Sequence, residues 1–211
     1  MTIGETLPQL QKDDLTANGL TPTSSLEGAM VCAGSGGATG CDALAPGSYT
    51  VLLESSTGSS FGVGLFELWE LENSSDQQTR LVNVSTRCLV RTGDEVAIAG
   101  VILGNPNSGA ATTLPRRTLL MFGKGPSLGI SGFLTDPFVT LQNSAGTTIS
   151  TNDNWKGLAK PLDELVEQNF DPTSDSESAL WPFLSANTSY TAILSGVNNV
   201  TGIGLIEMYE Y

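Results

Sequence analysis

Short apolar runs separated by turn residues recur along the chain and predict a protein built from β-strands. Residues 81–85 alternate apolar and polar side chains, which is typical of a strand with one buried face. Residues 96–103 are apolar throughout and predict a strand that is covered on both faces. A further strand is predicted at 117–123, and 138–150 predict a hairpin around the turn Asn143-Ser144-Ala145-Gly146.

Helical spacing of apolar residues marks two short stretches. The first lies near 7–18 and ends at the stop signal Asn18-Gly19, and the second lies near 160–169. The apolar positions that carry this spacing are Leu7, Leu10, Leu15, Leu162, Leu165 and Val166. We expect one short helix in each stretch.

A pair of strands at the end of the sequence is written twice in the chain. Residues 189–194 (SYTAIL) are followed by 202–211 (GIGLIEMYEY). Residues 48–53 (SYTVLL) are followed in the same way by 62–71 (GVGLFELWEL). We interpret each pair as a β-hairpin, and we interpret the match as an internal duplication, which identifies the unit that folds.

The duplication extends upstream of these strands but does not include the middle of the chain. Residues 22–30 match 172–180, and a predicted helix precedes each of them. The offset between the copies then shrinks, so the first copy carries an insertion that contains the loop between Cys32 and Cys41. The block from about Arg80 to Trp155 occurs once.

These matches predict an all-β chain made of one half repeat, 1–79, and one full repeat, 80–211. We expect the full repeat to be an antiparallel, jelly-roll-like β-sandwich. Half of a β-sandwich cannot bury its inner face alone. The N-terminal half must therefore join other sheets of its own chain or be completed by another molecule.

The charge balance argues against two classes of partner. The sequence has 22 acidic and 9 basic residues, a formal net charge of −13 and no histidine. Phosphate backbones and anionic lipids are bound by clustered lysine and arginine, so nucleic acid is not an expected partner. Membrane insertion is not expected either, since no apolar run approaches the roughly 20 residues that a membrane helix needs. The missing histidine removes the commonest general base and metal ligand.

The cysteines suggest one disulfide. Cys32 and Cys41 bracket a loop that is too rich in glycine to hold its shape by packing. A disulfide that closes this loop would stabilise the fold by restricting the unfolded chain. We expect this bridge, with buried free thiols as the alternative, and we expect Cys88 to be a small core residue.

Several short motifs are spread over the chain. They are Gly93-Asp94, Ile98-Ala99-Gly100, Gly125-Pro126-Ser127-Leu128, Asn152-Asp153-Asn154-Trp155, Glu177-Ser178-Ala179, Tyr190-Thr191-Ala192 and Gly204-Leu205-Ile206-Glu207-Met208-Tyr209. Together they resemble an uncharacterised repeat that occurs, often in tandem, in large secreted or surface-attached bacterial proteins. The resemblance implies a β module that is extracellular or on the bacterial cell surface, and it carries over no activity.

A looser pattern combines Leu141, Gly146 and Asn152-Asp153 with the later Tyr190-Thr191. It is similar to bacterial pre-peptidase C-terminal domains, which are jelly-roll-like sandwiches. The sequence departs from these families in two ways. Their members are usually modules of longer chains, whereas we expect this chain to consist of the modules alone. In addition, Ala186-Asn187-Thr188 stands where the first copy has Ala45-Pro46-Gly47.

Oxygen-bearing side chains near the end of the unique block are compatible with Ca²⁺. Asn152-Asp153-Asn154 offers carboxylate and amide oxygens, and Asp136, Asp175 and Glu177 are further candidates. The spacing is not that of an EF-hand loop, so we favour an Asx-rich turn at the ends of strands. We therefore expect no cofactor, with Ca²⁺ as the open alternative.

Two other patterns resemble catalytic motifs, and we interpret both as structural. Residues 123–127 (GKGPS) lack the ending and the following helix of a phosphate-binding loop, so we interpret them as a turn between strands. Glu67 and Glu207 occupy matching repeat positions on amphipathic strands, which favours a structural part over paired acids for glycoside hydrolysis. We expect no catalytic residues and no enzymatic activity.

The last strand is the candidate assembly element. Leu205, Tyr209 and Tyr211 lie on one face, and Ile206 and Met208 lie on the other. Both faces need cover, so we favour a central strand. The alternative is a strand that is shared with a neighbouring subunit through ladder hydrogen bonds.

Two functional hypotheses remain. The first is a non-catalytic extracellular structural subunit that assembles with copies of itself by sharing strands or half domains, into a filament or a surface layer. The second is a module that binds carbohydrate or another surface ligand, with Trp155, Trp181 or Trp69 as stacking platforms.

Overall fold

The computed structural model describes residues 13, 15–17, 19–21, 44–55, 58, 62–68, 81–104, 116–158, 162–167 and 169–210. The chain divides into two compact units, Met1–Arg80 and Leu81–Tyr211. The division falls beside the boundary between the half repeat and the full repeat.

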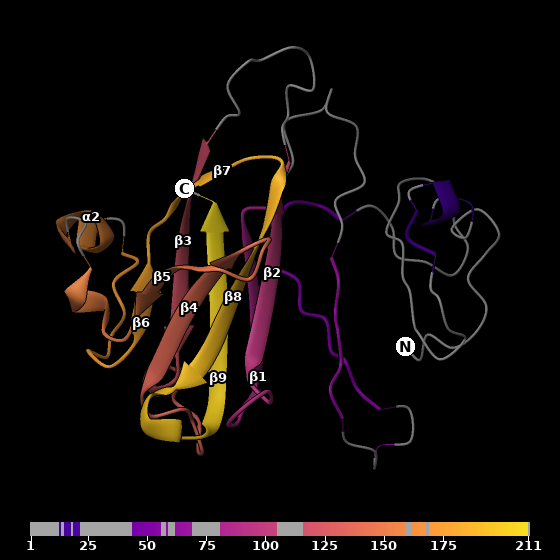
Figure 1. The fold of residues 1–211 in the computed structure, drawn as a ribbon. Helices are drawn as coiled ribbons and strands as arrows, with labels where there is room; N and C mark the ends of the chain where they lie inside the picture. The colour runs from indigo at the N-terminus through magenta and orange to yellow at the C-terminus, as the bar shows by residue number, and fades with distance from the viewer. Residues whose placement is uncertain are drawn as a thin grey trace. The chain divides into compact units, whose positions relative to one another are not determined.

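The second unit contains nine strands among its described residues. They are β1 (Asn83–Val90), β2 (Ala97–Leu103), β3 (Arg116–Lys124), β4 (Pro137–Asn143), β5 (Thr148–Asn152), β6 (Ser178–Leu180), β7 (Phe183–Ser185), β8 (Thr188–Gly196) and β9 (Gly202–Glu210). Short helical elements lie between them: η1 (Pro126–Leu128), η2 (Trp155–Gly157), α2 (Leu162–Glu167) and η3 (Val197–Asn199). Figure 1 shows their arrangement.

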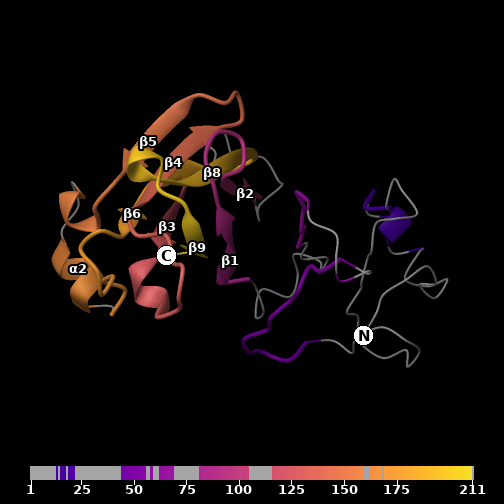
Figure 2. The same cartoon turned by 90° about the horizontal axis from the view of Figure 1, so that it is seen from below.

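The strands form two facing antiparallel sheets, which confirms the predicted β-sandwich. One sheet has the order β1-β9-β3-β6, with β7 also paired to β3, and the other has the order β2-β8-β4-β5. Figure 2 shows β5, β4, β8 and β2 in one layer and β6, β3, β9 and β1 in the other. The chain changes sheet at each step from β1 to β4, and β4 and β5 form the predicted hairpin.

The repeated pair of strands is not a hairpin, so that interpretation was wrong. β8 lies in the second sheet between β2 and β4, whereas β9 lies in the first sheet between β1 and β3. η3 carries the chain across, and Asn198 and Asn199 take positive φ angles of 52° and 62° there.

The main core lies between the sheets and follows the period of two along each strand. Leu194 of β8 is fully buried at its centre and points at the opposite sheet. A Cβ atom on Gly123 would lie 2.8 Å from Leu194 Cδ1, and one on Gly204 would lie 2.9 Å from Leu194 Cδ2. The two glycines therefore make the space that this leucine fills.

A second apolar cluster covers the outer face of β3. Trp155 of η2 and Leu165 of α2 pack against outward-facing side chains of β3, together with residues after α2. The buried members are Leu120, Phe122, Trp155, Leu165, Ala179 and Trp181. The stretch after β5 thus forms a third layer on this sheet, and β3 is buried on both faces.

The prediction that 96–103 would be covered on both faces was wrong. Ala97 and Leu103 are buried, but Ile98 is 59% exposed and Ile102 is 67% exposed. β2 is the first strand of its sheet, so a continuous apolar run here marks an edge strand.

The first unit is described in part. Asp13 and residues 15–17 are helical, as expected for the stretch near 7–18. Residues 44–55 and 62–68 lie outside helices and strands, and no ladder pairing is assigned to them within the described part of this unit. No helix among the described residues of either unit is long and apolar enough to cross a membrane.

Candidate functional site

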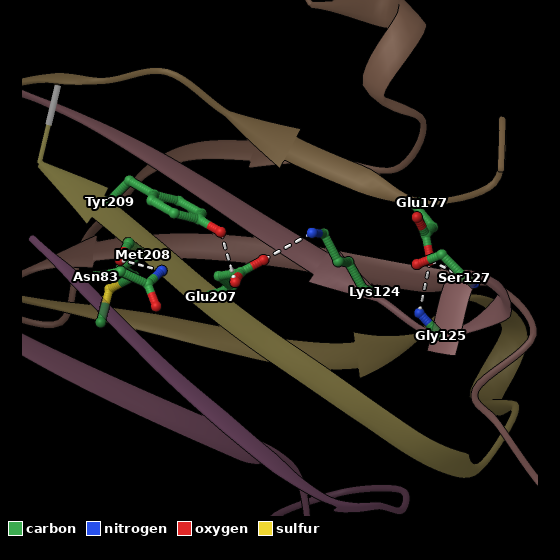
Figure 3. Close-up of polar contacts among 8 residues, drawn as sticks. All are labelled: Asn83, Lys124, Gly125, Ser127, Glu177, Glu207, Met208 and Tyr209. Carbon is green, nitrogen blue, oxygen red and sulfur yellow. Dashed lines mark hydrogen bonds and ion pairs between the residues drawn. The ribbon is translucent and has the colours of Figure 1, made fainter. Parts of the chain in front are cut away.

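The carboxylate of Glu177 is fully buried and holds a turn in place. Its Oε1 accepts hydrogen bonds from the backbone N–H groups of Gly125 and Ser127, both at 3.0 Å, and from Ser127 Oγ at 2.6 Å (Figure 3). These donors belong to the stretch that resembles a phosphate-binding loop. Gly123 and Lys124 of this stretch belong to β3, and the turn begins at Gly125 and continues into η1. The N–H groups of Gly125 and Ser127 bind a carboxylate of the same chain.

The remaining candidates for Ca²⁺ serve different partners. Asn152 accepts a hydrogen bond from the N–H of Ala179 at 2.9 Å and donates to the carbonyl of Asn154 at 3.1 Å. Asp175 forms an ion pair with Lys156. This arrangement braces the turn after β5 against β6.

Asp136 and Asp153 interact unfavourably. Burial raises the pKa of Asp136, and the nearby negative charge of Asp153 raises it further. Asp153 Oδ1 and Glu177 Oε2 are buried and accept no hydrogen bond. Within the described ranges, no three His, Cys, Asp or Glu side chains form a group that could hold a metal ion.

Glu207 joins β9 to β3 on the face opposite the main core (Figure 3). Its Oε2 lies 2.7 Å from Lys124 Nζ, and its Oε1 accepts a hydrogen bond from Tyr209 Oη at 2.7 Å. Burial raises the pKa of Tyr209, and the bond to Glu207 and its charge raise it further, so the phenol stays protonated and donates. Phe122 and Phe170 contact the same tyrosine ring. Because both carboxylate oxygens of Glu207 are held by other side chains, the geometry supports a structural role for Glu207.

The candidate assembly strand is β9, and the structure supports the central-strand reading. Met208 pairs with Val84 of β1 on one side and with Met121 of β3 on the other. The Asn83 side chain adds a hydrogen bond to the Met208 carbonyl at 3.2 Å (Figure 3). Sharing β9 with another subunit would therefore require β1 or β3 to leave.

The faces of β9 follow the predicted alternation. Ile206 and Met208 are buried in the main core, whereas Leu205 and Tyr209 lie on the other face and are partly buried. Tyr211 lies outside the described residues.

Two of the three tryptophans lack the exposed ring face that stacking on a sugar needs. Trp155 is buried, and its Nε1 donates to the Ser174 carbonyl at 3.0 Å. Trp181 is buried in the same outer cluster. Trp69 lies outside the described residues. Two adjoining hollows share Ser150 and Pro182, and none of the described residues that line them has an acidic or basic side chain.

One of the three cysteines, Cys88, lies among the described residues. Cys32 and Cys41 lie outside the described residues, and so does their predicted disulfide. Cys88 of β1 is a free thiol that packs against the main core. Burial raises the pKa of this thiol, which disfavours the reactive thiolate.

The first unit repeats one internal contact of the second. A Cβ atom on Gly64 would lie 2.6 Å from Leu53 Cδ2, which matches the approach of Leu194 to Gly204. The repeated tyrosines hydrogen-bond to different carbonyls: Tyr49 Oη donates to Ala45, four residues earlier, at 2.6 Å, and Tyr190 Oη donates to Ser185, five residues earlier, at 3.2 Å.

The repeated side chains differ greatly in exposure. Tyr49 is 56% exposed against 7% for Tyr190, and Leu53 is 62% exposed against 0% for Leu194. The other large exposed side chains of these two segments are Val51, Leu52, Val63, Leu65, Phe66 and Leu68. The sequence predicts an incomplete half repeat here, and the approach of Leu53 to Gly64 is visible only in the structure.

Comparison with known proteins leaves the chain without an assigned family. No family model matches the sequence, and no curated protein matches it.

Proposed function

We propose that this protein is a non-catalytic structural subunit of the extracellular space or the bacterial cell surface, which associates with copies of itself into a filament or layer. One observation carries the proposal. The sequences that form the buried and paired strands β8 and β9 in the second unit recur in the first unit, where the described residues lie outside helices and strands and expose their apolar side chains.

The physical reason is that, among the described residues, these segments lack the neighbouring strands that flank their counterparts. Their counterparts are flanked on both sides, by β2 and β4 for β8 and by β1 and β3 for β9. In the described part of the first unit no strand flanks residues 48–53 or 62–68. Contiguous exposed apolar side chains and open strand edges are typical of surfaces that bind other chains.

Binding of a surface glycan is less well supported. The described residues bury Trp155 and Trp181, two of the three stacking platforms on which that hypothesis rests.

Sedimentation velocity of the full chain over a wide concentration range tests the proposal. We expect the average mass to rise with concentration. The variant Leu52→Asp with Leu65→Asp should lower the mass, because both side chains are exposed in the first unit, at 73% and 79%. A chain that remains monomeric at every concentration would contradict the proposal.

A further inference from the structure

β2 is the least protected sheet edge in the described part of the second unit. One edge of β2 pairs with β8 without interruption from Ala97 opposite Leu194 to Leu103 opposite Thr188. The other edge has no partner strand among the described residues. The strand reads AIAGVIL and contains no charge, no proline and no bulge.

The other outer strands carry features that discourage pairing. β1 contains Arg87, the pairing of β4 with β5 shifts register between Leu141 and Gln142, and β6 and β7 are three residues long each. Charges, bulges and short length are the usual protections of sheet edges. β2 has none of them, and it adds exposed Ile98 and Ile102 on its outer face.

Residues 48–53 have the sequence that β2 already accepts. They read SYTVLL, and the β8 residues that pair with β2 include SYTAIL. In β8, Tyr190, Ala192 and Leu194 are buried, and Ser189, Thr191 and Ile193 lie on the other face. Residues 48–53 carry similar side chains in the same order, are uncharged and lie outside helices and strands, and Leu52 is 73% exposed.

We infer that the free edge of β2 binds residues 48–53 of a second copy of this chain by strand addition. Backbone hydrogen bonds along the edge would supply affinity, and the alternating side chains would supply specificity. The inference rests on the proposed function, because it specifies how the copies meet.

This contact joins two different surfaces, so it is heterologous. Each bound copy presents a new β2 edge and leaves its partner's own segment 48–53 free. A heterologous contact that does not close into a ring produces an open filament.

Paired variants test the inference. Ile98→Lys with Ile102→Lys disables the acceptor edge, and Leu52→Lys disables the donor segment, since a lysine on a strand edge opposes strand addition. We expect each variant to associate at least about tenfold more weakly than the native chain. A mixture of the two retains one intact contact, so it should form one-to-one dimers that do not grow.

A matched control lies at the opposite edge of the same sheet. Ile149→Lys places the charge on β5, where Ile149 is 45% exposed. This control should associate like the native chain.

Amide hydrogen exchange of the native chain tests the inference without any substitution that could disturb folding. Exchange in β2 should slow as concentration rises, while exchange in β5 should not change. Native-like association of the Ile98→Lys, Ile102→Lys variant, or concentration-independent exchange in β2, would overturn the inference and leave the proposed function intact. A native chain that never associates would overturn both.

Discussion

At the scale of single residues, the second unit depends on buried polar groups whose partners are distant in the sequence. Glu177 is the main example, because one oxygen of its carboxylate satisfies two backbone N–H groups and a hydroxyl of the turn before η1. Hydrogen bonds to a charged acceptor are stronger than neutral ones, and an unsatisfied buried donor is costly.

We expect Glu177→Ala to lower the free energy of unfolding by about 3–5 kcal/mol, since it strands the N–H groups of Gly125 and Ser127. Glu177→Gln keeps one acceptor oxygen and should cost about 1–2 kcal/mol. Urea titration measures both. Glu167→Gln on the exposed side of α2 is the control. If Glu177→Ala and this control lowered the free energy of unfolding equally, Glu177 would not anchor the turn.

Asp136 gives a pH-dependent prediction. Its pKa is raised in the folded state, so folding favours the protonated form, and stability falls as pH rises through the range between the unfolded and folded pKa values. Asp136→Asn removes this penalty. The variant should melt at a higher temperature than the native chain at pH 7, and the difference should vanish near pH 3, where both side chains are neutral. A difference that is independent of pH would show that ionisation is not its cause.

At the scale of elements, the alternation of apolar residues predicted most strands but did not predict their neighbours. The faces of β9 followed from the positions of Ile206 and Met208, and its central place followed from the need to cover both faces. The same reasoning predicted that 96–103 would be covered on both faces, but Ile98 and Ile102 are exposed, because an apolar composition alone does not show which faces are buried.

The site features were harder to predict than the strands. The partners of Glu177 lie about fifty residues away in the sequence, and no local pattern relates them. The crossing from β8 to β9 depends on close approaches between residues that no local pattern relates. A Cβ atom on Gly196 would clash with the backbone of Val200, and one on Gly202 would clash with the backbone of Phe133 and Leu134.

The fit of Leu194 between two glycines provides a test at this scale. Gly204→Ala places a methyl group 2.9 Å from Leu194 Cδ2 and 3.1 Å from Val90 Cγ2. Overpacking of this kind costs about 1–3 kcal/mol, and thermal unfolding should show a lower melting temperature. Gly100→Ala on β2 is the matched control, since its nearest neighbour would be 3.9 Å away. Loss of stability in the control alone would contradict this account of the core.

At the scale of the whole molecule, charge opposes the association that we propose. Each copy carries a formal net charge of −13, while β2 and residues 48–53 are uncharged. Repulsion between copies is screened by salt, with a Debye length of about 30 Å at 0.01 M and about 8 Å at 0.15 M.

Association should therefore strengthen as NaCl rises from about 0.01 to 0.15 M. Light scattering at fixed protein concentration measures the effect. Replacing NaCl with sodium sulfate at the same ionic strength separates charge screening from the salting-out of apolar surface. Weaker association at higher salt would indicate that ion pairs, and not apolar strands, hold the copies together.

The placement of β8 and β9 in opposite sheets has a consequence for valence. A half repeat built on this plan offers one strand to each of two sheets, and each strand has two sides. A single incoming strand occupies one of these four positions, so a growing thread would keep lateral attachment points along its length. Under the proposed association, such attachment points would let threads join side by side into a two-dimensional mat.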